Sequence, residues 1–122
     1  MPVLEIRTNL KKEQVPNGFL LKAAETIAQV TDKPIERVAC HVQTDQLMSF
    51  GGSESPCGSV TIRSIGNVKD RLDKLAKELT DLIVKELVIP SDRFYILFQE
   101  LGVDDVAHKG LTVRELRKQN PQ

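Results

Sequence analysis

The stretch that decides the fold is PVLEIRTN, residues 2–9, because its central part recurs in the second half of the chain. Residues 4–8 (LEIRT) resemble residues 60–64 (VTIRS), and residues 34–38 (PIERV) resemble residues 90–94 (PSDRF). The offset is 56 positions in both cases. Because one shift aligns both pairs of segments, the chain is predicted to contain an internal repeat of two similar units.

An amphipathic helix is predicted between the matched ends of each repeat. Phe19, Ala23, Ile27 and Val30 recur with helical spacing in the first half. The same offset of 56 places Leu75, Leu79 and Ile83 in a corresponding stripe of the second half.

These patterns predict an α/β fold of two tandem β-α-β units, with pseudo-repeats at residues 2–57 and 58–113. Right-handed crossovers would make the strands within each unit parallel. The result is a four-stranded mixed sheet with two helices on one face, in a single domain of residues 1–113. Residues 114–122 form a polar C-terminal extension.

The composition excludes several classes of function. The chain has 122 residues, with 17 Lys and Arg balanced by 17 Asp and Glu, so no basic excess indicates nucleic acid. No apolar stretch approaches the roughly 20 residues of a membrane span, and no signal peptide is visible. The two cysteines and two histidines are too scattered for a metal site, and no cofactor is expected.

Other local features give more detailed expectations. Residues 36–42 are predicted to form the second strand, and residues 44–58 a loop in which residues 47–50 are candidates for a short extra strand. Cys40 is expected to be a buried small hydrophobe, and Cys57 to be exposed after a proline.

The strands also predict oligomerisation. Residues 38–42 and 94–98 are apolar on both sides, and a sheet that is apolar on both faces is usually covered on both. Since only two helices are available, another subunit or a ligand would supply the second cover. The competing possibility is a monomeric, ferredoxin-like binding domain.

Pro2 is the most unusual candidate for chemistry. Removal of Met1 would leave Pro2 as a secondary amine, and burial would lower its pKa from about 8 toward neutrality. Pro2 would then be a neutral base at physiological pH. The alternative is that a small second residue reflects terminal processing only.

Several motifs together resemble the macrophage migration inhibitory factors of the tautomerase superfamily, which also holds D-dopachrome tautomerase. They are Met1-Pro2, Lys33-Pro34, Ser64-Ile65-Gly66, Asp92-Arg93-Phe94-Tyr95-Ile96 and the stretch DQLMSFGGS at residues 45–53. The likeness extends to about residue 113. It implies a homotrimer whose three sheets form a central barrel.

The resemblance also implies a cofactor-free keto-enol tautomerase acting on small aromatic α-keto acids such as phenylpyruvate, or on dopachrome-like rings. Pro2 would be the general base, and Lys33 would meet the substrate carboxylate or keto oxygen. Ile65 would supply a backbone N–H and an apolar wall, and Tyr95 would reach the pocket from the neighbouring subunit. Leu97 replaces the asparagine of many family members, which makes the site more apolar.

Each of these residues has a simpler alternative. Lys33 follows a helix, where the positive charge of a lysine interacts favourably with the helix dipole and stabilises the helix by at most about 1 kcal/mol. Tyr95 is compatible with a core aromatic, and His41 with a strand residue whose ring is satisfied. His108 fits a surface loop.

The alternative function is a secreted, cytokine-like trimer that binds a cell-surface receptor, with weak tautomerase activity. Lys12 and Asp45 match a charged pair linked to receptor contact in the family, although solvated loop charges are an equal explanation. The resemblance implies a cytoplasmic protein exported without a signal peptide. The second cysteine of the family's C-x-x-C pair, which begins at Cys57, is missing, and His108 and Val113 replace an aromatic pocket rim.

Overall fold

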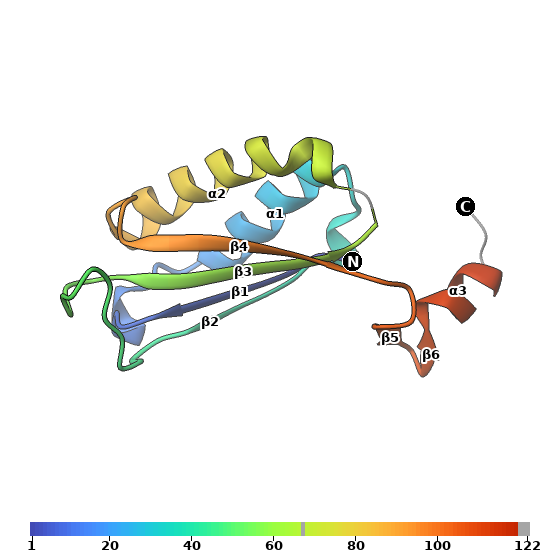
Figure 1. The fold of residues 1–122 in the computed structure, drawn as a ribbon, viewed down its shortest axis with the longest axis horizontal. Helices are drawn as coiled ribbons and strands as arrows, with labels where there is room; N and C mark the ends of the chain where they lie inside the picture. The colour runs from blue at the N-terminus through green and yellow to red at the C-terminus, as the bar shows by residue number, and fades with distance from the viewer. Residues whose placement is uncertain (67, 120–122) are drawn as a thin grey trace.

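The computed structural model describes residues 1–66 and 68–119, which form an α/β fold with one main sheet. Its strands have the order β2-β1-β3-β4, and a separate hairpin pairs β5 with β6. In Figure 1, α1 and α2 cover one face of the main sheet, and α3 lies beyond its end near the N-terminus. The elements are β1 (Val3–Thr8), η1 (Lys12–Gln14), α1 (Phe19–Thr31), η2 (Ile35–Arg37), β2 (Ala39–Gln43), β3 (Gly58–Ile65), η3 (Lys69–Arg71), α2 (Leu72–Leu87), β4 (Phe94–Leu101), β5 (Ala107–His108), β6 (Leu111–Thr112) and α3 (Val113–Gln119).

The predicted repeat is confirmed down to individual side chains. Within each unit the two strands are parallel, as expected. In the first unit Arg7 Nε donates a hydrogen bond to Gln43 Oε1 at 2.9 Å. Arg63 Nε and Gln99 Oε1 form the same bond at 2.8 Å in the second unit, with both residues 56 positions further on.

The two units are related by an approximate two-fold rotation. β1 and β3 pair antiparallel, and their register places Glu5 opposite Thr61, its own equivalent in the repeat. The helix ends also correspond, because Asp32 after α1 and Val88 after α2 both have left-handed backbones, with φ of 54° and 57°. The mixed sheet therefore arises from two parallel pairs joined antiparallel at the centre.

The hydrophobic core lies between the helices and the sheet. The predicted helical stripes supply one side of it, and β1 and β3 contribute alternate residues from the other. Burying such aliphatic side chains contributes roughly 1.5–3 kcal/mol each. Residues exposed by 1% or less include Phe19, Ala23 and Ile27 of α1, Leu75, Leu79 and Ile83 of α2, and Leu4, Ile6 and Val60 of the sheet.

The sheet face opposite the helices differs from the prediction, because its centre is polar. Glu5 Oε2 lies 3.0 Å from Arg63 Nη1, and Glu5 Oε1 lies 4.0 Å from His41 Nε2. Exposed large apolar side chains remain on β4, where Tyr95 is 70% and Leu97 56% exposed. The exposed apolar surface of this face is therefore concentrated along the β4 edge rather than spread over the whole face.

Some local predictions were wrong. The second strand begins at Ala39, because residues 35–37 form a 3₁₀ turn in which the Arg37 N–H bonds to Pro34 O at 3.0 Å. Residues 47–49 form no strand, and Phe50 makes only an isolated bridge to Ser53.

The cysteines also differ from expectation. Cys57 is fully buried, since its N–H donates to Asn9 Oδ1 at 3.0 Å and its carbonyl accepts the Thr8 hydroxyl at 2.7 Å. Cys40 is only half-buried. Burial nonetheless raises the pKa of the Cys40 thiol to about 11.

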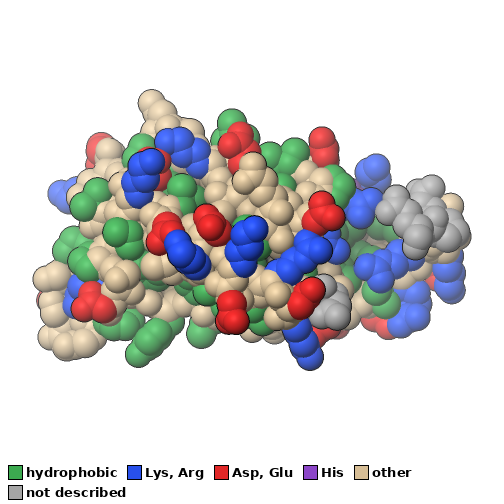
Figure 2. Space-filling view, turned by 90° about the horizontal axis from the view of Figure 1, so that it is seen from above, with side chains coloured by type: hydrophobic (Ala, Val, Ile, Leu, Met, Phe, Trp, Pro, Cys, Tyr) green, Lys and Arg blue, Asp and Glu red, His purple; other side chains and the backbone are tan. Residues whose placement is uncertain are grey.

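The outer face of the helix layer carries interspersed charges of both signs (Figure 2). Within residues 1–66 and 68–119, no cluster of three or more His, Cys, Asp and Glu side chains is placed to hold a metal ion. Across the same ranges, every helix is too short or too polar to cross a membrane.

Candidate active site

The start of the chain is held inside the fold. Pro2 is buried, and its carbonyl accepts the N–H of Ala39 at 3.0 Å. Because β1 runs antiparallel to β3, Val3 lies opposite Arg63, near the carboxyl end of β3. The terminal amine is therefore fixed where three strands meet.

Two cavities flank this terminus. The smaller one, of about 130 Å³, is lined by Pro2 together with residues of β3, α2 and β4. The larger one has a volume of about 930 Å³ and mixed polar and apolar walls. Its lining residues are Met1, Val3, Lys33, Arg37, Val38, Ala39, Ile65, Val106, Ala107, His108, Lys109, Val113, Leu116 and Arg117.

Lys33 reaches the larger cavity because of how α1 ends. Asp32 adopts a left-handed conformation that stops the helix, and the Lys33 N–H bonds to Ala28 O at 3.2 Å. Gly66, which lines the smaller cavity, has φ of 93°, and a Cβ added there would lie 3.8 Å from Lys33 Nζ, an ordinary van der Waals distance. The positive φ therefore favours glycine at this position, directly after Ile65, which is buried and lines the larger cavity together with Lys33.

The environment of the terminus disfavours a positive charge. The pKa of the Met1 α-amine is lowered from 8.0 to about 6, first by burial and then by the positive charges of Lys33, Arg37 and Arg117. A neutral amine is thereby stabilised near physiological pH. The predicted base, the Pro2 amine, would need the same property after removal of Met1.

The outer wall of the cavity comes from the C-terminal segment. β5 and β6 are joined by a tight turn in which Lys109 and Gly110 both have positive φ, 56° and 83°. His108 is exposed on β5, in a two-residue strand rather than the predicted loop. Val113, at the start of α3, is buried.

The structure also adds residues to the site that the sequence did not indicate. Arg37 and Arg117 line the larger cavity, although they lie 80 positions apart in the chain. No spacing in the sequence links a 3₁₀ turn to a C-terminal helix. The only signal in the sequence was an arginine in each segment to which no role had been assigned.

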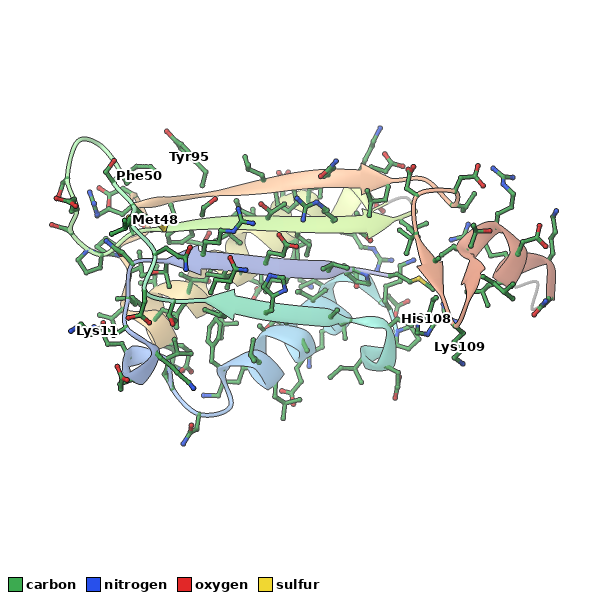
Figure 3. All side chains as sticks on the ribbon, turned by 90° about the horizontal axis from the view of Figure 1, so that it is seen from below. Lys11, Met48, Phe50, Tyr95, His108 and Lys109 are labelled. Carbon is green, nitrogen blue, oxygen red and sulfur yellow. The ribbon has the colours of Figure 1, made fainter. Side chains whose placement is uncertain are left out.

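Within one chain, neither Tyr95 nor Leu97 lines this cavity. Tyr95 pairs with Ser59 at the start of β3, whereas Ile65 ends that strand. Its ring packs on Phe50, with the centroids 5.0 Å apart. Figure 3 places Tyr95 and Phe50 at one end of the sheet, and His108 and Lys109 at the other.

Lys12 and Asp45 are both exposed, and no salt bridge joins them within the described residues. Asp45 has φ of 59° and its N–H bonds to Leu10 O at 2.8 Å. The two residues therefore follow the carboxyl ends of β1 and β2, at the opposite end of these strands from the N-terminus.

Comparison with known proteins identifies the family. The family model described as macrophage migration inhibitory factor matches residues 1–114. The chain belongs to the macrophage migration inhibitory factor family. This family lies within the tautomerase superfamily, as the sequence motifs predicted.

Relatives in the macrophage migration inhibitory factor family match over nearly their whole length. The Xenopus laevis factor is 39% identical over 113 residues, covering 92% of this chain and 98% of that protein. The Trichinella spiralis homologue is 38% identical, covering 92% and 99%. Its solved structure superposes with a TM-score of 0.86 over 90% of this chain and 98% of that chain.

A homologue from Prochlorococcus marinus shares the fold at a lower sequence identity. Its structure gives a TM-score of 0.84 at 24% identity, covering 91% of this chain and 98% of that chain. The match to the family model ends at residue 114, so most of α3 lies outside it. The part of the cavity wall formed by Leu116 and Arg117 is thus an addition of this chain to the matched region.

Proposed function

We propose that the protein is a cofactor-free keto-enol tautomerase whose general base is the amine of Pro2, exposed by removal of Met1. The observation that carries this proposal is the amine of Met1, which lies at this cavity and whose pKa is lowered to about 6. After removal of Met1, the Pro2 nitrogen would border the space that Met1 occupied. A base with a pKa near the working pH is the most effective one for proton transfer.

In the proposed reaction, the Pro2 nitrogen takes a proton from the carbon next to the keto group. The electron pair of that C–H bond forms the C=C bond, and the carbonyl oxygen gains negative charge. Lys33 would stabilise this oxygen or bind the substrate carboxylate, in a site where Ile65 excludes water. The protonated Pro2 then returns the proton to the oxygen, which yields the enol and the free base.

The proposed active site lies between subunits of a homotrimer. Tyr95 and Leu97 are exposed on the β4 edge, and neither lines the cavity of its own chain. A neighbouring subunit would bring them to the cavity of the next chain. The apolar character of these two side chains favours small aromatic α-keto acids such as phenylpyruvate, or dopachrome-like rings.

The test combines mass spectrometry with turnover of phenylpyruvate. The intact mass should show loss of Met1, and Pro2→Gly should lower the rate by about 100-fold or more, as expected for a general base. Inserting alanine between Met1 and Pro2 should abolish activity as well, because the proline nitrogen then lies in a peptide bond. Pro16→Gly, at an exposed proline outside the cavity, is the matched control and should keep full activity.

Unchanged turnover in the alanine insertion would refute Pro2 as the base. Light scattering tests the assembly separately, since a monomer would leave Tyr95 and Leu97 without a role in the site. Tyr95→Phe and Leu97→Asn should change the KM for phenylpyruvate in the trimer.

The second candidate function is receptor binding by a cytokine-like trimer, supported by membership of the macrophage migration inhibitory factor family. Lys12 and Asp45 would present charges at the end of the molecule away from the cavity. The test is binding to cells that carry chemokine receptors, using the double variant Lys12→Ala, Asp45→Ala. Binding that is absent in the natural protein, alongside rapid turnover, would exclude this function.

A further inference from the structure

We propose that Arg37 and Arg117 form an anion-binding subsite in the larger cavity, which receives a second carboxylate of the substrate. The favoured ligands would then be 2-keto acids with two negative charges rather than simple monocarboxylates. This inference rests on the proposed function, because it names the substrate class of the same cavity.

The first support is the charge of the cavity wall. Its fourteen lining residues include four cations, Lys33, Arg37, Lys109 and Arg117, and no Asp or Glu. Among the residues that the structure describes, none of these four side chains has an ion pair or a side-chain hydrogen bond. A substrate with one carboxylate would engage Lys33 and leave the two arginines without an anion.

The internal repeat shows how unusual this arrangement is for Arg37. Its equivalent, 56 positions later, is Arg93, which donates hydrogen bonds to the carbonyl oxygens of Phe50, Ser53, Ser55 and Pro56 at 2.9–3.1 Å. The guanidinium group of Arg93 thus has hydrogen-bond partners in the adjacent loop. Arg37 occupies the same position in the scaffold but faces a cavity.

The position of Arg117 is fixed by α3. Val113, Leu116 and Arg117 have the i, i+3, i+4 spacing of one helix face, and all three line the cavity. The other basic residues of this helix have partners outside the cavity. Arg114 forms two hydrogen bonds of 2.7 Å with Asp104, and Lys118 pairs with Glu115 at 3.1 Å.

The backbone reinforces this anchoring. The Val113 N–H bonds to Val106 O at 2.9 Å, and the Arg114 N–H bonds to Val103 O at 3.1 Å. Arg117 is therefore presented to the cavity by a helix that is held at its first turn. Guanidinium groups suit this role, since their planar fork binds a carboxylate through two parallel hydrogen bonds.

The electrostatic effect on the terminus agrees with this geometry. Arg37 and Arg117 both contribute to the lowered pKa of the Met1 amine, which places their charges close to the terminus. Opposite charges attract more strongly in a partly enclosed site than in bulk water. A dianionic ligand would offset the repulsion among the cations of the wall.

The test compares two keto acids that differ by one carboxylate, phenylpyruvate and (4-carboxyphenyl)pyruvate. Dissociation constants are measured by calorimetry with the full-length protein, so the result does not depend on turnover. We expect the carboxylated acid to bind about tenfold more tightly, the value of one partly screened charge-assisted hydrogen bond. The preference should shrink when the ionic strength is raised to about 1 M.

Variants assign the effect to the two arginines. Arg37→Met and Arg117→Met keep an unbranched side chain without the charge, and each should bring the ratio of the two dissociation constants close to one. Arg117→Glu should reverse the preference. Lys118→Met lies on the same helix outside the cavity and should leave the ratio unchanged.

Equal dissociation constants for the two acids in the natural protein would overturn the subsite, whether or not phenylpyruvate is turned over. A ratio unaffected by both arginine variants would overturn it as well. Tight, arginine-dependent binding without any turnover would support the subsite and refute the tautomerase instead.

Discussion

Replacing Val88 by glycine should stabilise the protein. Val88 follows α2 with φ of 57° and ψ of 39°, and 75% of its surface is exposed. A left-handed backbone costs an L-residue roughly 1–2 kcal/mol, and the cost is highest for a β-branched side chain. Glycine removes this strain but adds roughly 0.5–1 kcal/mol of chain entropy to the unfolded state. The expected net gain is about 0.5–1 kcal/mol per chain.

The internal repeat supplies a matched control for this substitution. Asp32 follows α1 with φ of 54° and ψ of 39°, nearly the same conformation. Aspartate tolerates the left-handed region better than valine, so Asp32→Gly should give no gain or a small loss. A further variant, Val88→Asn, should stabilise at least as much as glycine, because asparagine accepts the conformation without the entropy cost.

Urea unfolding at equal protein concentrations measures these differences, with circular dichroism as the signal. A gain of 0.5–1 kcal/mol corresponds to roughly 2–4 °C in Tm for a chain of this length. If Val88→Gly destabilised the protein, or if both glycine variants changed stability equally, strain at Val88 would not be the cause.

Three further predictions concern other parts of the molecule. Arg93→Ala should lower the free energy of unfolding by about 2–3 kcal/mol, since it removes charge-assisted hydrogen bonds to the loop of residues 50–56. Hydrogen exchange of the amides in this loop should become faster. Unchanged exchange would show that the loop is ordered without Arg93. Cys40 and Cys57 should resist a thiol reagent at pH 8, because Cys57 is buried and the pKa of Cys40 is about 11, and both should react after unfolding; rapid labelling of the folded protein would contradict this. In protein that keeps Met1, the amine has a pKa of about 6 when folded and 8.0 when unfolded, so only the unfolded chain binds the proton between these values. The free energy of unfolding should therefore fall as the pH is lowered from 8 to 6, and acetylating the amine should remove that part of the dependence.

The fold was predictable because repeats and periodicity are local properties of the sequence. The offset that aligns residues 4–8 with residues 60–64 also aligns the helical stripes, and the structure confirms both units. Strand faces were predicted less well. The short apolar runs of β2 and β4 suggested two apolar faces, whereas Glu5 and Arg63 on the neighbouring strands make the centre of one face polar.

The candidate site was predictable only in part. Pro2, Lys33 and Ile65 were named from motifs, and the structure places the chain terminus, Lys33 and Ile65 around one cavity. Tyr95 does not line that cavity in its own chain, and its contribution from a neighbouring chain stays a prediction. The burial of Cys57 was missed, because its backbone partners Thr8 and Asn9 lie 49 and 48 positions away in the chain.

The sequence alone determined the two β-α-β units, the buried faces of their helices and the family. These follow from side-chain periods and motifs within each segment, which the chain carries wherever it is placed. Tertiary structure alone decided which segment ends meet. The antiparallel register of β1 and β3 places the N-terminus at the carboxyl end of β3, and the anchoring of α3 brings Arg117 to the same cavity as Arg37. Contacts between segments that are distant in the chain depend on strand direction and long-range packing, which local sequence patterns do not encode.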